Sequence, residues 1–278
     1  MIPASLTFAL QEKTSSTLPE PNADAARRYD IAKRDIGGIG VAVFRQETAL
    51  AELDDALSKN RHVKLAFCNA HIVNLAANDP VLQQLLSQFL VLADGVGVDF
   101  ASKLLHGARF PANLNGTDFI PFFLAAQSRQ LRVALLGGKP GVAERAAQRF
   151  AADHPQHRFT VIGHGYVAGD EEAAMLSRLD ADPADLLLVA MGNPRQERFI
   201  AEKLGGQHCT VAAGVGALFD FIAGDVPRAP EPIRELRLEW LYRLWVEPGR
   251  LWRRYIFGNP VFLLRILRLR LFHRKLAG

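Results

Sequence analysis

Cysteine is scarce in this sequence, and no metal-binding pattern accompanies it. Two cysteines, Cys68 and Cys209, occur in 278 residues, each inside an apolar run and without the spacing of a metal-ligand pair. Residues 1–10 have neither the basic start nor the apolar stretch of a secretory signal peptide. We therefore expect a cytoplasmic protein whose cysteines are reduced core residues, with no metal site and no bound cofactor.

Long hydrophobic runs and the standard nucleotide motifs are also missing. In the C-terminal region the longest stretch without a charge, 255–264, has ten residues and is too short to cross a bilayer. The sequence contains no Gly-x-Gly-x-x-Gly fingerprint, no P-loop and no Gly-x-Ser-x-Gly elbow. These absences argue against a membrane span there, a P-loop nucleotidase and an elbow-type hydrolase.

Positive charge is concentrated at the C-terminal end. Residues 225–278 hold twelve Lys and Arg against five Asp and Glu, a net +7, so the rest of the chain carries −3 of the total +4. This asymmetry predicts an anionic partner: nucleic acid, phospholipid headgroups or a phosphorylated substrate. Arginines interleave with aliphatic residues over 261–272, which favours a helix in the headgroup plane over nucleic-acid binding; packing on its own domain is the alternative.

Short β-rich runs alternate with helical patterns from Gly37 onward, as in a parallel sheet joined by crossover helices. Several runs are apolar without alternation, which is typical of strands covered on both faces. The sequence therefore predicts an α/β, Rossmann-like, doubly wound parallel sheet with a C-terminal basic helical appendage. Strands are predicted at 62–67, 132–136, 159–162, 185–191 and 209–213, and helices at 80–89, 98–105, 119–129, 142–153, 171–179, 195–204, 233–245, 251–257 and 261–272.

We expect three segments along the chain. Residues 1–36 show little periodicity and are predicted to be a mobile leader. Residues 37–224 form the Rossmann-like domain, and residues 225–278 form the basic appendage.

The segment 189–198 is the most informative loop. Strand-like residues run into Gly-Asn-Pro at 192–194, and Gln196 and Glu197 then open a helix. In an open α/β sheet the loops after strand carboxyl ends bind ligands, and a helix N-terminus there favours anions. An amide beside a carboxylate suits a ribose or a base edge.

Other loops after predicted strands carry glycine or a polar side chain. Residues 135–144 and 214–220 are glycine-bearing turns. They suit phosphate binding, and the alternative is a tight turn with no ligand. Asp94 precedes two glycines, so it is a candidate general base or a helix cap. Residues 113–118 are a polar shelf for a sugar or an Asx turn, and Asn69 closes the first predicted strand. Convergence of these loops on one edge predicts a nucleotide pocket.

Two further patterns have simpler explanations. His71 has the side chain that titrates near neutral pH, but a lone histidine is more often structural. The Asp-Ala-Asp sequence at 180–182 has the form of a metal-nucleotide motif, yet it precedes a strand and so lies at the wrong edge of the sheet. We interpret it as a solvated turn.

Taken together and in order, these motifs resemble the WecG/TagA/CpsF glycosyltransferase family. The resemblance covers about 37–254. The segments that carry it are 69–70 (Asn-Ala), 94–97 (Asp-Gly-Val-Gly), 115–118 (Asn-Gly-Thr-Asp), 136–138 (Leu-Gly-Gly), 163–166 (Gly-His-Gly-Tyr), 192–197 (Gly-Asn-Pro-Arg-Gln-Glu), 214–220 (Gly-Val-Gly-Ala-Leu-Phe-Asp), 228–230 (Arg-Ala-Pro), 238–244 (Leu-Glu-Trp-Leu-Tyr-Arg-Leu) and 247–250 (Glu-Pro-Gly-Arg).

Members of that family move a sugar from a UDP-sugar onto a polyprenyl-diphosphate-linked saccharide at the inner face of the cytoplasmic membrane, with inversion and without an essential metal. The resemblance implies the same donor, acceptor and peripheral location here, with 37–224 as the catalytic domain. It implies no cofactor and no nucleic-acid partner. Whether the chain forms a homo-oligomer is left open.

The resemblance also implies roles for single residues. Asp94 would deprotonate the acceptor hydroxyl, with Asn69 beside it in the catalytic centre. Arginines of the appendage and helix N-termini would stabilise the departing diphosphate in place of a metal. The substrate- and nucleotide-binding residues implied in this way are Asn115, Thr117, Asp118, Gly137, Gly138, Tyr166, Asn193, Gln196, Glu197, Gly214, Gly216, Asp220, Arg228, Arg234, Arg237 and Arg243.

One departure from the family pattern bears on the substrate. Wall-teichoic-acid members commonly carry Thr two residues before the Asn, where this chain has Phe67. The sequences at 104–107 and 113–116 are more similar to exopolysaccharide members, which favours glucose over N-acetylmannosamine or its uronic acid. The rival hypothesis is a non-catalytic UDP-sugar-binding protein on the same fold, which would need no base.

Overall fold

The structure is a computed structural model that describes residues 31–276 except 167, with side chains up to 272. Every element below belongs to the unit Ala32–Gly278. Most of the predicted leader, 1–36, lies outside the described residues. Its last residues belong to the fold, because Lys33–Asp35 (β1) pairs antiparallel with Gly40–Ala42 (β2) and Ile36 is fully buried.

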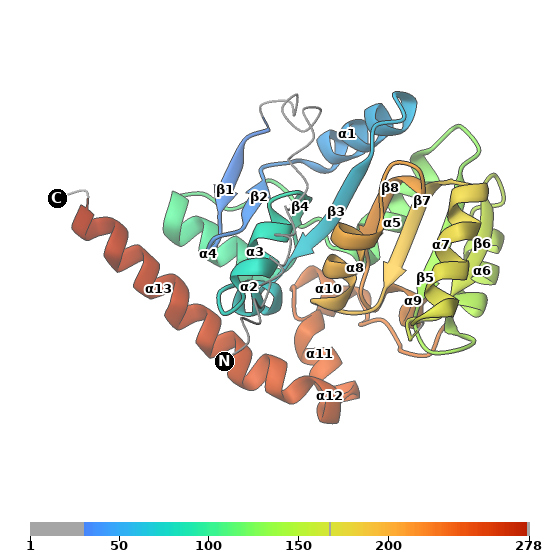
Figure 1. Ribbon diagram of the computed structural model, residues 1–278. Helices are drawn as coiled ribbons and strands as arrows, with labels where there is room; N and C mark the ends of the chain where they lie inside the picture. The colour runs from blue at the N-terminus through green and yellow to red at the C-terminus, as the bar shows by residue number, and fades with distance from the viewer. Residues whose placement is uncertain (1–30, 167, 277–278) are drawn as a thin grey trace, which may run out of the picture. The chain divides into compact units, whose positions relative to one another are not determined.

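Six parallel strands form the central sheet, in the order β4-β3-β8-β7-β5-β6 (Figure 1), so the predicted α/β, Rossmann-like fold is confirmed. Their bounds are Val63–Cys68 (β3), Leu90–Ala93 (β4), Arg132–Gly137 (β5), Arg158–Gly163 (β6), Ala184–Ala190 (β7) and Cys209–Gly214 (β8). The sequence patterns missed β4, because its four apolar residues follow an apolar helix after a short turn. Strand β2 lies against this edge strand.

Helices connect the strands and cover both faces of the sheet. They are Gln46–Ser58 (α1), Ala70–Ala76 (α2), Pro80–Leu86 (α3), Val96–His106 (α4), Gly116–Ala126 (α5), Val142–Asp153 (α6), Asp170–Ala181 (α7), Arg195–Lys203 (α8) and Leu218–Ile222 (α9). Local chemistry fixes several starts: the side chains of Asn69, Asp79 and Asn115 each accept backbone N–H groups in the first turn of α2, α3 and α5.

Strand order explains where a ligand crevice forms. The connection from β5 through α6 leads to β6, whereas the connection from β7 through α8 leads the opposite way to β8. Because right-handed crossovers then place α6 and α8 on opposite faces, the loops after β5 and β7 diverge at the carboxyl edge. Such a switch point is where doubly wound sheets bind ligands.

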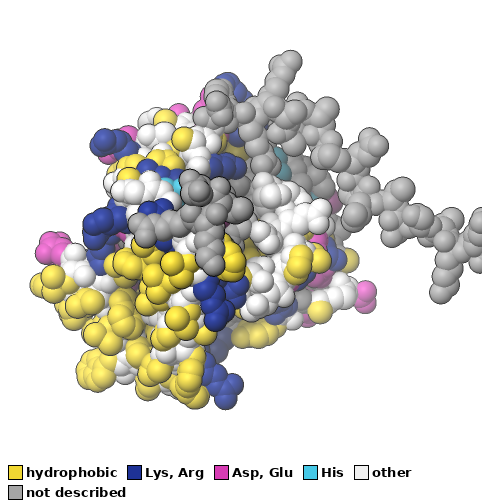
Figure 2. Space-filling model, turned by 90° about the vertical axis from the view of Figure 1, so that its left-hand side faces the viewer, with side chains coloured by type: hydrophobic (Ala, Val, Ile, Leu, Met, Phe, Trp, Pro, Cys, Tyr) yellow, Lys and Arg dark blue, Asp and Glu magenta, His cyan; other side chains and the backbone are white. Residues whose placement is uncertain are grey.

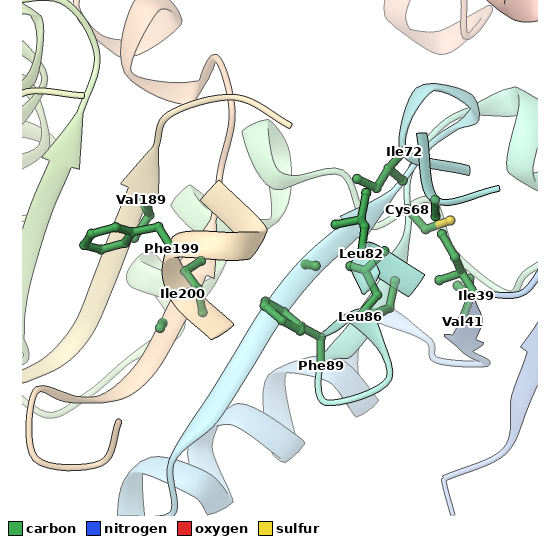
Figure 3. Close-up of a cluster of buried hydrophobic side chains, with 14 of the residues drawn as sticks. Ile39, Val41, Cys68, Ile72, Leu82, Leu86, Phe89, Val189, Phe199 and Ile200 are labelled. Atoms are coloured by element: carbon green, nitrogen blue, oxygen red, sulfur yellow. The ribbon is translucent and has the colours of Figure 1, made fainter. Parts of the chain in front are cut away.

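The core consists of apolar side chains between the sheet and its helices. On one face Val189 packs with Phe199 and Ile200 of α8, while α2 and α3 contribute Ile72 and Leu82 (Figure 3). Cys68 and Cys209 are buried free thiols, and burial raises the pKa of Cys209 to about 12. The prediction of reduced core cysteines is confirmed.

The C-terminal region is helical but divided differently from the prediction. The expected helix at 233–245 is two helices, because the backbone breaks where Arg237 has φ +58°. The two helices expected at 251–257 and 261–272 run on continuously. The elements are Glu231–Glu235 (α10), Glu239–Val246 (α11), Pro248–Trp252 (α12), the π-helix Arg253–Phe257 (η2) and Gly258–Leu276 (α13).

Helix α13 is attached to the sheet region through one narrow face. Phe262 and Ile266 are fully buried where α13 packs on α2 and α4. The Nδ2 of Asn74 in α2 also donates to the carbonyl of Gly258 at 2.7 Å. Within 31–276, position 167 aside, no helix is long and apolar enough to span a membrane.

Candidate active site

The predicted site residues converge on the carboxyl edge of the sheet. Asn69 follows β3, Asp94 follows β4, Gly138 follows β5, Gly192 follows β7 and Val215 follows β8. Asp94 and Gly138 flank three intervening strands, so they lie about 19 Å apart along this edge at the usual strand spacing. The candidate site is therefore elongated along the edge of the sheet.

Asp94 is a partly buried carboxylate held by its neighbours. Its backbone N–H donates to the carbonyl of Cys68 at 2.8 Å, and Asn69 Nδ2 donates to its Oδ2 at 3.2 Å. The Oδ1 of Asn69 meanwhile caps α2, which fixes the amide orientation. Burial raises the pKa of Asp94, and the Asn69 hydrogen bond opposes this. A carboxylate with a raised pKa and a fixed direction suits a general base.

Helices of the appendage bring charges to Asp94 from far along the chain. The guanidinium groups of Arg254 in η2 and Arg243 in α11 lower the pKa of Asp94, whereas Glu239 raises it. Arg254 is half-buried, and burial lowers its pKa. Among the described residues, the Nε of Arg243 and the Nε of Arg254 have no hydrogen-bond partner. Arg254 was not among the predicted site residues; the only signal for it is its place in a basic run beside aromatic residues.

His71 lies in the same region and is affected by the same cation. Burial, with a further contribution from Arg254, lowers the pKa of His71 to about 4. His71 is therefore neutral at physiological pH, so a protonated imidazole is not available here.

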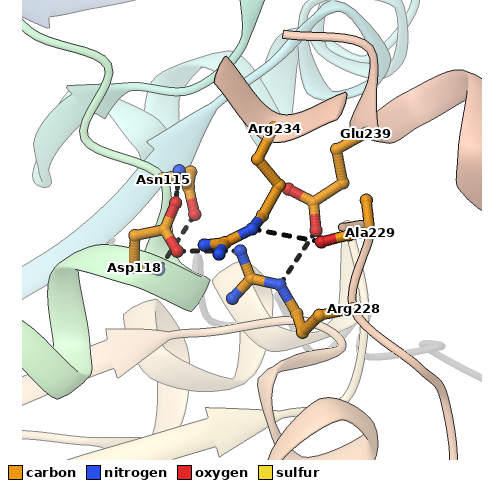
Figure 4. A network of polar contacts seen from close by, with 6 residues as sticks. All are labelled: Asn115, Asp118, Arg228, Ala229, Arg234 and Glu239. Carbon is orange, nitrogen blue, oxygen red and sulfur yellow. Dashed lines mark hydrogen bonds and ion pairs between the residues drawn. The ribbon is translucent and has the colours of Figure 1, made fainter. Parts of the chain in front are cut away.

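A charged network joins α5 to the appendage (Figure 4). Arg228 donates to Asp118 at 2.8 Å and to Glu239 at 3.0 Å. Asp118 also accepts from Asn115, at 2.8 Å. Thr117 is in the same first turn of α5. The predicted residues of this shelf and the predicted arginine are thus brought together by direct contacts.

The other predicted arginines lie on the same C-terminal segment in different surroundings. Arg234 donates to the carbonyl of Ala229 at 3.1 Å. Arg237 forms an ion pair with the buried Asp99 of α4, so the charge of Arg237 is compensated within the protein. The guanidinium of Arg243 lies over the ring of Phe221, 4.9 Å from the centroid.

The glycines after β5 are required by close backbone contact. Gly137 has φ +133°, and a Cβ there would lie 2.3 Å from the carbonyl oxygen of Ala190. The N–H of Gly138 donates to that same carbonyl at 2.8 Å, and Gly165 donates to Gly138 at 2.8 Å. Three loops are therefore held against one another by main-chain bonds, which leaves no room for side chains between them.

Gln196 links the loop after β7 to the loop after β8. Its Oε1 accepts from the N–H of Gly192 at 3.2 Å and of Gly216 at 3.0 Å. A Cβ on Gly214 would lie 2.9 Å from its Nε2, so glycine is needed there as well. Both polar ends of Gln196 bind protein groups, and the side chain is only 2% exposed. Gln196 therefore positions the two loops.

Two further predicted residues follow β6, at the end of this edge, and β8, near its middle. The ring of Tyr166 is exposed beyond β6, and Arg195 lies over it with its guanidinium carbon 5.9 Å from the centroid. Asp220, in α9, is half-buried, and burial raises its pKa while Arg250 opposes this. Tyr166 is the aromatic face available at the far end of the edge from Asp94.

Phe67 has a packing role that accounts for its place in the sequence. Its ring fills the space beside Gly116, where a Cβ would lie 2.9 Å from the ring. The ring is 7% exposed. Phe67 therefore makes an apolar contact between β3 and the start of α5.

Comparison with known proteins agrees with this geometry. The glycosyl transferase WecG/TagA/CpsF family matches residues 34–276. The chain is 31% identical over 214 residues to the N-acetylglucosaminyldiphosphoundecaprenol N-acetyl-beta-D-mannosaminyltransferase of Bacillus spizizenii, covering 76% of this chain and 81% of the relative. It is 30% identical over 185 residues to the enzyme of the same name from Bacillus subtilis, covering 66% of this chain and 70% of the relative. The chain therefore belongs to the WecG/TagA/CpsF family and is a glycosyltransferase.

Proposed function

We propose that this enzyme transfers a sugar from a UDP-sugar, with inversion and without a metal, to a polyprenyl-diphosphate-linked saccharide during synthesis of an exopolysaccharide or surface glycan. The names of both relatives specify an acceptor of this kind, N-acetylglucosamine on diphosphoundecaprenol. The single observation that carries the proposal is Asp94, a carboxylate with a raised pKa that Asn69 orients beside cations of the appendage.

The proposed step is a direct displacement. Asp94 takes the proton of the acceptor hydroxyl, the acceptor oxygen attacks the anomeric carbon, and the bond from that carbon to the UDP oxygen breaks. The configuration inverts because attack and departure occur on opposite faces. Arg243 and Arg254 supply positive charge near the reacting carboxylate, and the N-termini of α4 and α8 offer N–H groups to the leaving diphosphate.

The proposed location is the inner face of the cytoplasmic membrane, and the surface of the appendage supports it. Large apolar side chains are exposed along α11 to α13 and gather with Lys and Arg on one face (Figure 2). They include Leu241, Trp245, Ile256, Phe257, Leu264, Leu267, Leu271 and Phe272. An apolar hollow of about 520 Å³ between α10 and α11 is continuous with this surface. Apolar side chains bordered by arginine suit an anionic bilayer surface.

The decisive test replaces Asp94. Asp94→Asn keeps the hydrogen-bonding shape of the side chain but cannot accept the proton, so turnover is expected to fall about 10³-fold while UDP-sugar binding stays close to wild type. The measurement uses a lipid-diphosphate disaccharide acceptor, a panel of UDP-sugars and product masses. Asp54→Asn, an exposed change on α1, is the matched control. Full turnover by Asp94→Asn would remove Asp94 from the role of base, and binding without any product from the wild-type protein would favour the non-catalytic alternative.

The same assay addresses the finer parts of the proposal. Product from UDP-glucose would support an exopolysaccharide member, whereas product from UDP-N-acetylmannosamine would agree with the names of the relatives. Turnover that persists in excess chelator is expected for a metal-independent enzyme, and turnover lost to the chelator and restored by Mg²⁺ would contradict it.

A further inference from the structure

Glu197 is a buried carboxyl group placed between the two loops that Gln196 joins. It is 1% exposed, in the first turn of α8. Its Oε1 accepts from Asn193 Nδ2 at 2.6 Å and from Gln196 Nε2 at 2.9 Å. Its Oε2 is buried and has no hydrogen-bond partner in the described part of the chain. Oε1 therefore accepts both side-chain hydrogen bonds, and Oε2 accepts none from the described residues.

The direction of these bonds is fixed by the backbone. The Oε1 of Gln196 accepts two main-chain N–H groups, from Gly192 and Gly216, so its Nε2 must face Glu197. Glu197 then needs only an acceptor at Oε1. A carboxylate accepts these bonds more strongly, but an uncharged carboxyl group with its proton on Oε2 keeps the same acceptor at Oε1.

No cation compensates a negative charge at this position within the described residues. The charged and titratable side chains on α8, and on the elements packed against it, have other partners or lie at the far ends of their strands. They are Arg195, Arg198, Glu202 and Lys203 on α8, Asp79 at α3, Lys64 on β3, Asp185 on β7, Cys209 on β8 and Glu172 on α7. A buried carboxylate without a cation is costly, so the neutral form is favoured.

We propose that Glu197 is a positioning residue of the donor site and that it acts in its protonated, uncharged form, holding Asn193 and Gln196 so that the loops after β7 and β8 keep a fixed spacing. Burial raises the pKa of Glu197 to about 7 against the opposing hydrogen bonds of its neighbours. Near neutral pH the proton is therefore gained or lost, and deprotonation places an uncompensated charge beneath both loops.

The protonation state is tested by stability, without any ligand. In the unfolded chain this carboxyl ionises near 4.5, so between about pH 4.5 and 7 the folded chain holds the extra proton and stability falls as the pH rises. E197Q removes this titration. Its melting temperature is expected to exceed that of the wild type above about pH 7 and to approach it below about pH 4.5. A difference in melting temperature between E197Q and wild type that does not change between about pH 4.5 and 7 would overturn the neutral form.

The positioning role is tested by amide hydrogen exchange. The N–H groups of Gly192 and Gly216 both donate to Gln196 Oε1, so their exchange rates report how firmly Gln196 is held. E197A is expected to speed this exchange at least about tenfold. E197Q is expected to leave it within about threefold of wild type. E202Q, on the exposed side of the same helix, is the matched control. Unchanged exchange in E197A would show that Glu197 does not hold the loops.

A third measurement rests on the UDP-sugar donor proposed above. Binding of UDP-glucose is measured by calorimetry in the Asp94→Asn background, so that neither turnover nor titration of Asp94 contributes. The dissociation constant is expected to rise by up to about tenfold per pH unit above pH 7 with Glu197 present, and to stay flat with E197Q. An unchanged slope in E197Q would overturn the link to the donor site. Failure to bind UDP-glucose at any pH would count against that donor. The amide exchange rates and melting temperatures would still decide the role of Glu197.

Discussion

Apolar side chains are mostly buried in residues 32–224 and mostly exposed in residues 225–272. In the first region the strands β3, β4, β5, β7 and β8 are largely buried, and β8 is buried along its whole length. In the second region few apolar residues are buried, namely Ala229, Leu251, Phe262 and Ile266, while most large ones face outward. Exposed apolar surface of this extent is unusual in a soluble monomer, which is why the proposed membrane contact is placed on the C-terminal helices and not on the sheet region.

The two regions nevertheless both contribute to the proposed reacting centre. The sheet edge supplies Asp94 and the glycine loops, and the C-terminal helices supply Arg243 and Arg254. Most of the burial that stabilises the fold lies in residues 32–224, whereas residues 225–272 supply positive charge to the proposed site. Substitutions can separate the two contributions.

The largest loss is expected from adding one methyl group inside the sheet region. Gly137→Ala forces a Cβ to within 2.3 Å of a backbone oxygen at φ +133°. We expect about 3 kcal/mol or more of lost unfolding free energy, measured by urea denaturation. Gly249→Ala, in α12 with nothing within 4 Å, is the control and is expected to be neutral or slightly stabilising. Equal losses of unfolding free energy in the two variants would contradict this contrast between the regions.

Removing the buried anchor of α13 is expected to cost nearly as much. Phe262 is 1% exposed where α13 packs on α2 and α4, so Phe262→Ala leaves a cavity that costs about 3 kcal/mol of unfolding free energy. Leu263→Ala, on the neighbouring exposed position, is expected to change stability by less than about 0.5 kcal/mol. Similar losses for both would mean that α13 is held by more than its narrow face.

Arg254→Met is expected to act on catalysis more than on folding. The cation lowers the pKa of Asp94, so removing it raises that pKa further. Because the deprotonated carboxylate is the proposed base, the acid limb of the kcat/KM profile should move to higher pH, by up to about one pH unit. Arg253→Met is the control on the exposed adjacent position. A limb that moves to lower pH would contradict the assignment.

The smallest effect on folding is expected from the exposed apolar stripe. Replacing Leu264 and Leu267 together by Ser should change the free energy of unfolding by less than about 1 kcal/mol, because both are largely solvent-exposed. Binding to anionic vesicles, measured by sedimentation, should fall about tenfold or more and should weaken with salt in the parent protein. Undiminished vesicle binding would argue that another surface meets the membrane.

Local sequence patterns were sufficient for most of the sheet. Apolar runs bounded by glycine predicted five strands close to their observed bounds, and α6 was predicted at its observed residues, Val142–Asp153. Strand β4 was missed because four apolar residues after an apolar helix have no period of their own. The break between α10 and α11 was missed because an arginine with positive φ leaves no mark in a helical pattern.

The sequence by itself determined the alternation of strands and helices, the glycine turns and the family, because each depends on neighbouring residues or on an ordered set of short motifs. Tertiary structure alone decided the strand order that separates Asp94 from Gly138, the arrival of Arg254 near Asp94, and the burial of Glu197 between two loops. The physical reason is that pairing order and desolvation arise from contacts between residues far apart in the chain, for which a single sequence carries no local signal.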